Sequence, residues 1–372
     1  MPRLKKTPTC EIIRPFDLDK ATWKHITIRS HGSIVASAAL ARLRAFKPPP
    51  SQYTKLPLTR RASVLILLFA DRRGDLRVIL TIRSAKLRNY AGQAALPGGK
   101  ADTEAETAWM TARREAEEEI GLPSNDEHLP SGYTVEKLTE LPANLAMTEL
   151  GVMPCVAWLR SLSKDADIAK DLLPRLDARE VAAVFTAPFE QFLKQRDDVD
   201  VEGEWYRGAW HSWYHEPWRM HMFHVPVTPR TVFRSQEVEN TRLDAATAPC
   251  SPESKAPVLL ADRAAQAYGK PVPGSSGPEK VDKSLAQMDA LDMPRYRVFG
   301  MTARILVDAA RVAYGRDPEF EHNSHFGDEE MIAKLMKMGR LKPKKENGEI
   351  LTRDVMEAAA NIELSSEEKG KL

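Results

Sequence analysis

The chain has 372 residues, of which 42% are hydrophobic and 28% are charged, a composition typical of a water-soluble globular protein. Its formal net charge of +2 gives no strong general attraction to nucleic acid, and no apolar run approaches membrane-spanning length. The three cysteines, Cys10, Cys155 and Cys250, are far apart and odd in number, which indicates a reducing compartment and no disulfide framework. We therefore expect neither a nucleic-acid partner nor a membrane anchor.

The first part of the chain predicts an arm, a helix and a β-hairpin. Residues 1–29 are expected to form an N-terminal arm, and apolar positions at helical spacing predict a mostly helical stretch within Lys20–Phe46, which a run of prolines ends. Ser63–Phe69 is a short apolar run suited to a buried strand. Leu76–Ile82 alternates apolar and polar residues, and the charged turn before it favours pairing with the first strand as a hairpin.

The sequence LPGGKADTEAETAWMTARREAEEEIGL at Leu96–Leu122 predicts a glycine turn, a helix and a helix stop. The Pro-Gly-Gly turn at 97–99 lets the backbone approach a ligand closely. Thr103 and Glu106 have the spacing of a capping box, so we expect the helix to begin there. Gly121, followed by a proline two residues later, is a stop signal.

Three acids of this helix, Glu115, Glu118 and Glu119, share one arc at roughly 100° per residue. The neighbouring arc is apolar and should face the core; it holds Ala105, Ala108, Ala112, Ala116 and Ile120. Like charges three and four residues apart repel, and a divalent cation such as Mg²⁺ would relieve that repulsion. The alternative is a solvated acidic face balanced by Arg113 and Arg114, but the glycine turn upstream favours the metal site.

The second half of the stretch resembles the Nudix hydrolase signature, Arg-Glu-aliphatic-x-Glu-Glu-x-Gly-aliphatic. The matching residues are Arg114, Glu115, Ala116, Glu118, Glu119, Gly121 and Leu122. The first half departs from it, because fourteen residues separate Gly99 from Arg114, one more than the general pattern has. The early acidic position therefore falls on either Glu104 or Glu106. The same expansion is a feature of the coenzyme A diphosphatase branch of the family.

The residues just upstream resemble an extra motif of that branch. The shared positions are Arg83, Ser84, Leu87, Arg88, Gly92 and Gln93, whereas Tyr90 stands where the branch often has histidine. Arg83 and Arg88 are either surface residues or phosphate contacts, since a diphosphate would lie at the loop that follows. The expected substrate-binding residues are Arg83, Arg88, Gly92, Gln93, Gly98, Gly99 and Lys100.

The chain after the signature predicts further strands at 132–141, 152–159 and 181–185, and a short helix at Phe189–Leu193. In Trp205–Val227, four tryptophans and four histidines fit an aromatic hairpin better than an adenine-stacking or zinc site.

The last third of the chain predicts an insertion, a helix and an extension. Residues 228–295 are rich in Pro, Ser, Ala, Lys and Glu and predict a disordered insertion. Val298–Leu306 resembles the helix that closes the domain of this branch. We therefore expect a Nudix domain over 30–316 and a helical, charged extension over 317–372.

The resemblance implies an α/β/α sandwich with a mixed central sheet. It also implies a hydrolase that uses Mg²⁺ or Mn²⁺, held by Glu115, Glu118 and Glu119, to cleave a nucleoside diphosphate linked to another group. Arg114 completes the expected catalytic set; it should face away from the metal arc and orient the glycine loop or an acid. The general base stays open between one of the helix glutamates and an acid of a later loop. Arg179-Glu180, before the strand at 181–185, resembles an acidic element of the Nudix fold.

Three functions remain open at this point. They are a coenzyme A diphosphatase, another Nudix hydrolase such as one acting on oxidised nucleoside triphosphates, and a non-catalytic Nudix scaffold. The chain ends in Gly370-Lys371-Leu372, which matches a terminal Ser-Lys-Leu peroxisomal address at two of three positions. The expected location is therefore the peroxisome, through an import receptor, or the cytoplasm.

Overall fold

The computed structural model describes residues 31–84, 90, 92–161, 180–196, 204–213, 216–227, 232–233, 295–344 and 351–364. The expectations for the N-terminal arm, for Arg88, for most of the 228–295 segment and for the terminal Gly370-Lys371-Leu372 concern residues outside this part of the chain. Among the described helices, none combines the length and the hydropathy that crossing a bilayer requires.

A mixed β-sheet forms the centre of the described part. Its strand order is β11-β8-β2-β1-β7-β5, and the pairing of β1 with β7 is parallel whereas the other neighbours are antiparallel. These strands are β1 (Arg61–Ala70), β2 (Leu76–Arg83), β5 (Tyr133–Glu140), β7 (Gly151–Ser161), β8 (Val181–Pro188) and β11 (Val232–Phe233). Three short strands pair with β2, β1 and β7 in turn: β3 (Ala94–Ala95), β4 (Gly98–Lys100) and β6 (Asn144–Leu145).

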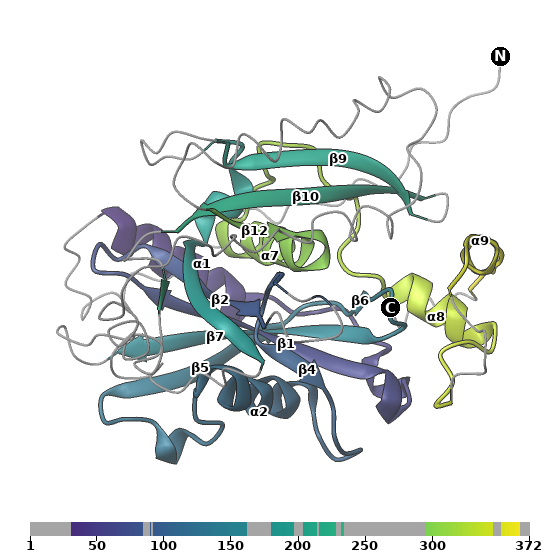
Figure 1. The fold of residues 1–372 in the computed structure, drawn as a ribbon, viewed down its shortest axis with the longest axis horizontal. Coiled ribbons are helices and arrows are strands. Elements are labelled where there is room, and N and C mark those ends of the chain that lie inside the picture. The colour runs from purple at the N-terminus through teal and green to yellow at the C-terminus, as the bar shows by residue number, and fades with distance from the viewer. Residues whose placement is uncertain are drawn as a thin grey trace, which may run out of the picture.

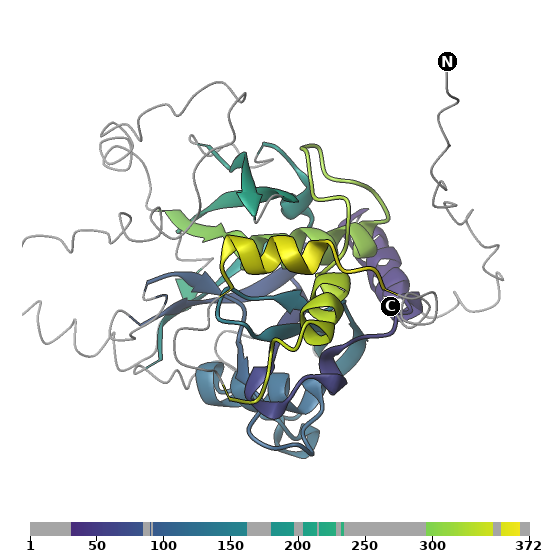
Figure 2. The ribbon, with the colours of Figure 1, turned by 90° about the vertical axis from the view of Figure 1, so that its right-hand side faces the viewer.

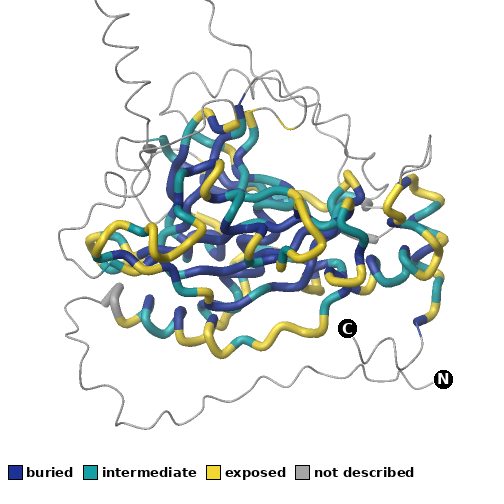
Figure 3. The backbone as a smooth tube through the Cα atoms, turned by 90° about the horizontal axis from the view of Figure 1, so that it is seen from below, coloured by how far each residue is buried: buried dark blue, intermediate teal, exposed yellow. Residues whose placement is uncertain are grey.

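Helices cover both faces of this sheet, so the α/β/α sandwich predicted from the sequence is confirmed (Figure 1). On one face α2 (Ala108–Ile120) packs against β1 and β7, and on the other lie α1 (His31–Ala45) and α7 (Gly300–Tyr314). The two apolar cores follow the side-chain alternation of β1, where Leu65 faces the α2 side and Ile66 the α7 side. Figure 3 shows that the buried residues concentrate along the strands.

A three-stranded sheet adds a further layer outside α7. Its order is β12 (Arg295–Phe299), β10 (Glu216–Pro226) and β9 (Tyr206–Trp213), so the hairpin predicted within Trp205–Val227 is confirmed. Trp205 is buried against Phe192 and Phe223 and is therefore a core residue rather than a base-stacking one.

The predicted insertion is wrong at its two ends. Val232–Phe233 forms β11, which pairs with β8 at the edge of the central sheet, and Arg295 begins β12. Strand pairing over a long sequence separation fixes these residues, and a composition bias cannot reveal such pairing.

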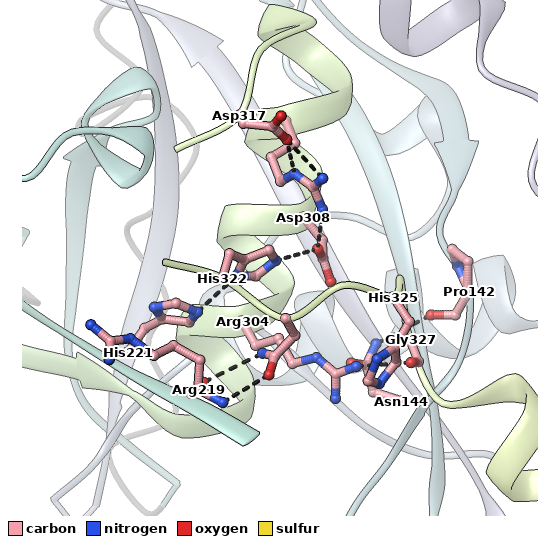
Figure 4. A network of polar contacts seen from close by, with 12 residues as sticks. Pro142, Asn144, Arg219, His221, Arg304, Asp308, Asp317, His322, His325 and Gly327 are labelled. Atoms are coloured by element: carbon pink, nitrogen blue, oxygen red, sulfur yellow. Dashed lines mark hydrogen bonds and ion pairs between the residues drawn. The ribbon is translucent and has the colours of Figure 1, made fainter. Parts of the chain in front are cut away.

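A chain of buried polar side chains fastens the segment that follows α7 to strand β10 (Figure 4). His322, in this segment, lies between α7 and β10. Its Nδ1 is 2.8 Å from Nε2 of His221 in β10, and its Nε2 is 2.8 Å from Oδ1 of Asp308 in α7. Tyr206 continues the chain to Nδ1 of His221 at 3.0 Å. Burial lowers the pKa of His221 to about 2, so this ring is neutral and structural, as expected for a hairpin histidine.

Two short helices close the described chain, α8 (Glu329–Lys337) and α9 (Arg353–Ala360). They lie together at one end of the molecule (Figure 2). Their apolar side chains belong to the same core as α2, and those that are buried include Ile332, Leu335, Met356 and Ala359. The C-terminal helices expected from the sequence are therefore present and share a core with the signature helix.

Candidate functional site

Two glycines set the distance between the signature loop and its neighbours. Gly98 and Gly99 lie in β4, which pairs antiparallel with Val64 and Ser63 of β1. A Cβ atom on Gly98 would collide with the backbone of Ser63, and one on Gly99 would collide with the carboxylate of Glu115. Glycine is therefore required at 98 for the loop to pair with β1, and glycine at 99 lets the loop lie against the Glu115 carboxylate without displacing it.

The signature helix begins later than the sequence predicts. Its N-cap is Thr107, whose hydroxyl accepts a hydrogen bond from the Met110 amide at 3.2 Å, so the capping box expected at Thr103 is wrong. Ala105 consequently lies before the helix and is exposed, whereas the other four apolar positions of the predicted arc are buried. The stop at Gly121 is confirmed, with a left-handed φ of 72°.

Glu106 does not cap the helix because its carboxylate binds Arg114, the arginine of the signature. Its carboxylate lies 2.9 Å from Nε of Arg114 and also accepts bonds from the Thr111 hydroxyl and the Asp102 amide. Burial acts to raise the pKa of Glu106, but its bonds with Arg114, Asp102 and Thr111 lower it overall. Glu104 is exposed and pairs with Arg61 at 3.1 Å, so of the two candidates for the early acid it is Glu106 that contacts the signature arginine.

The three acids of the arc differ sharply in burial. The side chain of Glu119 is 5% exposed, that of Glu115 is 14% exposed and that of Glu118 is 55% exposed. Glu119 accepts a hydrogen bond from the Gly98 amide at 3.2 Å, which ties the most buried acid to the glycine turn. The arc thus runs from the core to solvent, as its position beside the apolar face predicts.

Burial raises the pKa of Glu119 to about 8, against the Gly98 amide and Arg83, which lower it; Glu115 and Glu180 raise it further. Burial also raises the pKa of Glu115, opposed by Arg114 and assisted by Glu118 and Glu180. Glu180, just before β8, is thus a fourth carboxylate of the site. The hydrogen bond from the Ser84 amide to the Glu180 carbonyl, 2.7 Å long, brings it there.

Arg114 does not face away from the acids, so that expectation is wrong. Its Nη1 lies 2.9 Å from Glu115 and 3.3 Å from Glu118, because the long side chain lies back over the helix surface and reaches neighbours in both directions. Its Nη2 donates to the Lys100 carbonyl at 2.7 Å, which orients the glycine loop as expected. Burial acts to lower the pKa of Arg114, but its bonds to Glu106 and Glu115 raise it.

The loop carrying the upstream motif closes with backbone bonds around Arg83. The Arg83 amide donates to the Gln93 carbonyl and the Gly92 amide donates to the Arg83 carbonyl, each at 3.0 Å, and Gly92 has φ of 72°. Nη1 of Arg83 lies 3.9 Å from Glu119. In the described part of the chain its Nε is buried without a hydrogen-bond partner.

The structure therefore brings most of the residues expected from the sequence together around β4, the end of β2 and helix α2. The exceptions are Arg88, which lies outside the described residues, and Lys100, whose side chain is exposed and whose carbonyl is the group that contributes.

The donor set suits a hard divalent cation, which takes carboxylate oxygens. Glu115, Glu118, Glu119 and Glu180 supply them; the charges of Glu115 and Glu180 raise the pKa of Glu119, and those of Glu118 and Glu180 raise the pKa of Glu115. Among the described residues no three such side chains already converge at metal-binding distances. Arg114 and Arg83 balance part of the acidic charge instead.

Comparison with known proteins agrees with this geometry. Residues 59–210 match the NUDIX domain family model. The chain is 44% identical over 146 residues to the mitochondrial Nudix hydrolase 15 of Arabidopsis thaliana, which is 39% of this chain and 46% of that protein. It is 38% identical over 177 residues to the peroxisomal coenzyme A diphosphatase 1 of Saccharomyces cerevisiae, 44% of this chain and 52% of that protein.

The match thus spans about half the length of each of these two relatives. A third relative is covered almost completely: the chain is 34% identical over 189 residues to the Nudix hydrolase NudL of Shigella flexneri, which is 50% of this chain and 86% of NudL. Together with the sandwich fold and the signature helix, this similarity shows that the chain belongs to the Nudix hydrolase family.

Proposed function

We propose that this protein is a Mg²⁺- or Mn²⁺-dependent diphosphatase that hydrolyses the diphosphate bond of coenzyme A or acyl-coenzyme A. The products are 3′,5′-ADP and (acyl-)4′-phosphopantetheine. The observation that carries the proposal is the position of Arg83: its Nη1 lies 3.9 Å from Glu119, the most buried acid of the signature helix, and its Nε is buried without a partner in the described chain. A diphosphate oxygen is the acceptor that such a group suits.

The burial and charge of each site residue indicate its role. Glu115, Glu118 and Glu119 hold the metal, which when bound neutralises charge on the diphosphate and activates water. Gly98 and Gly99 let the loop lie directly against β1 and the Glu115 carboxylate, and Arg83, whose amide is bonded to the Gln93 carbonyl, orients the diphosphate together with Gln93.

Arg114 keeps the glycine loop and the helix acids in register through its bonds to Lys100 and Glu115. Two carboxylates are candidates for the general base: Glu119, whose pKa is raised by burial, and Glu180, which approaches from a separate element.

The coenzyme A substrate is favoured over other nucleoside diphosphates by two kinds of likeness. One is the motif around Arg83 together with the one-residue expansion before Arg114. The other is similarity to proteins named peroxisomal coenzyme A diphosphatase in Saccharomyces cerevisiae and, at 36% identity over 142 residues, in Caenorhabditis elegans. Tyr90, exposed and departing from the motif, keeps other nucleotide substrates as the alternative. The intact acids argue against a non-catalytic scaffold.

The test is a turnover screen of the full chain with Mg²⁺ across coenzyme A, acyl-coenzyme A and oxidised nucleoside triphosphates. Glu118→Gln removes a charge from an exposed side chain without changing its shape. We expect most turnover to be lost, by about 100-fold or more, with little change in stability. Higher kcat/KM for the triphosphates would reject the coenzyme A assignment, and near-normal activity of the variant would reject the metal role of this helix.

The proposed location is the peroxisome, with the cytoplasm as alternative. N-terminally tagged full chain and a chain lacking Gly370-Lys371-Leu372 should differ in localisation if this tail binds an import receptor. The same diffuse signal from both would reject the address.

A further inference from the structure

The chain enters helix α8 through a glycine and two acids, Gly327, Asp328 and Glu329, that are held deep in the fold. Glu329 is buried, and Asp328 is covered except for a small part of its side chain. These residues lie well beyond the segment 59–210 that matches the family model, in the part of the sequence expected to be an extension.

Glu329 joins two segments of the domain that are distant in sequence. Its Oε1 accepts hydrogen bonds from the Ser51 hydroxyl at 2.6 Å and from the Ala143 amide at 2.7 Å, and its Oε2 accepts from the Gln52 amide at 2.8 Å. Every one of these groups donates, so both oxygens must accept. A glutamine here would turn an NH₂ group toward one of the two backbone N–H groups. The site therefore requires a carboxylate.

The neighbours of Glu329 fix its position in the fold. The Asp328 amide donates to the Ala143 carbonyl at 2.7 Å, and the Leu145 amide donates to the Asp328 carboxylate at 2.8 Å, so the segment runs along β6. Arg304 of α7 bonds both oxygens of Asp328 and the carbonyl of Gly327. Figure 4 shows Arg304 extending toward Gly327. A Cβ on Gly327 would lie 2.7 Å from the Ala143 carbonyl oxygen, which leaves no room for movement.

The segment that Glu329 holds leads directly to the signature helix. Ser51 and Gln52 precede the 3₁₀ turn η2 (Tyr53–Lys55), and the ring of Tyr53 is buried in the same core cluster as Ala108 and Ala112 of α2. Thr111 of the same helix donates its hydroxyl to Glu106 at 3.0 Å, and the buried hydroxyl of Tyr53 has no hydrogen-bond partner among the described residues, so Tyr53 contacts the helix by packing.

A second connection runs from η2 to the loop before the helix. The carbonyls of Thr54 and Leu56 accept bonds from Arg61 at 2.9 and 2.6 Å, and the guanidinium of Arg61 pairs with Glu104. The Arg61 carbonyl in turn accepts from the Ala101 amide, immediately after the glycine strand β4. A shift of η2 would therefore move both the start of α2 and the glycine turn.

We propose that Glu329 is a positioning residue for the signature helix. By fixing η2 against β6 it sets the placement of Tyr53 and Arg61, and through them the geometry of the carboxylates on α2. This inference rests on the proposed function, in which those carboxylates hold a divalent metal. The competing view is that Glu329 only adds stability to the fold.

The experiment measures Mn²⁺ binding to the full chain by titration calorimetry, at a temperature well below unfolding, together with the Tm in EDTA. We expect Glu329→Gln to weaken Mn²⁺ binding about fivefold, less than the roughly tenfold loss that follows when a direct hydrogen-bond partner of a metal ligand is removed. The matched control is Glu330→Gln, the same change one residue on, because Glu330 is 61% exposed and pairs with Lys334 on the helix surface. The control should bind Mn²⁺ as the wild type does.

A lower Tm with unchanged Mn²⁺ affinity in Glu329→Gln would show a merely structural role and overturn the inference. If that variant does not fold, Ser51→Ala replaces it. This change removes the donor to Glu329 and the acceptor of the Tyr53 amide, and leaves the amides of Gln52 and Ala143 bonded to Glu329. It should weaken Mn²⁺ binding about threefold, a loss on the order of one net hydrogen bond, and no change would overturn the inference.

Glu118→Gln separates the two proposals. Wild-type Mn²⁺ affinity in that variant, or no binding by the wild type, would reject the proposed metal function and this inference with it. Loss of binding in Glu118→Gln alongside wild-type binding in Glu329→Gln would reject the inference alone.

Discussion

The most buried acid of the site, Glu119, gives the sharpest prediction: Glu119→Gln should stabilise the metal-free protein at neutral and alkaline pH while it removes metal binding. The pKa of this carboxyl is raised from 4.5 to about 8, first by burial and then by the charges of Glu115 and Glu180. A raised pKa means that the folded protein holds the proton more tightly than the unfolded chain does. The contribution of this group to stability is therefore greatest below pH 4.5 and is lost as the pH rises toward 8.

The magnitude follows from the shift. At about 1.4 kcal/mol per pKa unit, a carboxyl raised from 4.5 to about 8 makes the folded state about 3 kcal/mol less stable at pH 7 than it is below pH 4.5. Glutamine carries no charge at any of these pH values, and its side-chain oxygen still accepts from the Gly98 amide. The variant loses the partner of Arg83, an offset that keeps the gain at or below this figure.

The assay is thermal or urea unfolding in EDTA at several pH values between 5 and 8. The wild type should lose stability across this interval, whereas Glu119→Gln should be flatter and the more stable of the two at pH 8. Added Mg²⁺ should stabilise the wild type by mass action and leave the variant nearly unchanged. Equal pH slopes for the two proteins, or a variant less stable than the wild type at pH 8, would refute the reasoning.

Two further predictions concern the glycine turn and the ion pair between Arg304 and Asp328 before α8. Gly99→Ala places a methyl group against the Glu115 carboxylate, so we expect turnover and Mg²⁺ affinity to fall about tenfold or more. The control is Gly92→Ala, which has open space around it and should lower the free energy of unfolding by only about 1 kcal/mol, through backbone strain. Asp328→Asn leaves the buried Arg304 without its charge partner and should lower the free energy of unfolding by about 3 kcal/mol in urea at pH 7. Burial acts to raise the pKa of Asp328, but Arg304 lowers it to about 2, so the wild type keeps this stabilisation above pH 3.8 and loses it as the pH falls through 2. Wild-type unfolding curves for Asp328→Asn at both pH 7 and pH 3 would contradict this reading of the pair.

Local patterns predicted much of the fold and the acid arc of the site. A short apolar run predicted β1, alternation predicted β2, and closely spaced aromatic residues predicted the β9–β10 hairpin. The helical period placed Glu119 at the edge of the apolar face, and its burial agrees with that placement. These patterns involve residues fewer than five positions apart, so they can be recognised in the sequence alone.

The features that escaped prediction depend on the choice among several chemically similar partners. Thr103 and Thr107 are both acceptable N-caps, and the helix begins at the second because Glu106 is engaged by Arg114. The long arginine side chain reaches acids before and after it, so helical angles alone do not decide which way it points. Glu329 and Gln52 are separated by 277 positions, and no local pattern connects an acid to a backbone amide so far away.

The unequal burial of the three helix acids separates two effects that a signature motif treats as one. Glu118 is mostly in water, where its charge costs the fold little, so changing it should affect metal binding alone. Glu119 is in the core, where its charge opposes folding until a cation lies beside it. Glu115 lies between them and already has Arg114 as a partner at 2.9 Å. A divalent ion would therefore stabilise the fold most through Glu119, because the charge of this acid destabilises the metal-free protein most. Metal binding and the stability of the signature helix are thus coupled through Glu119.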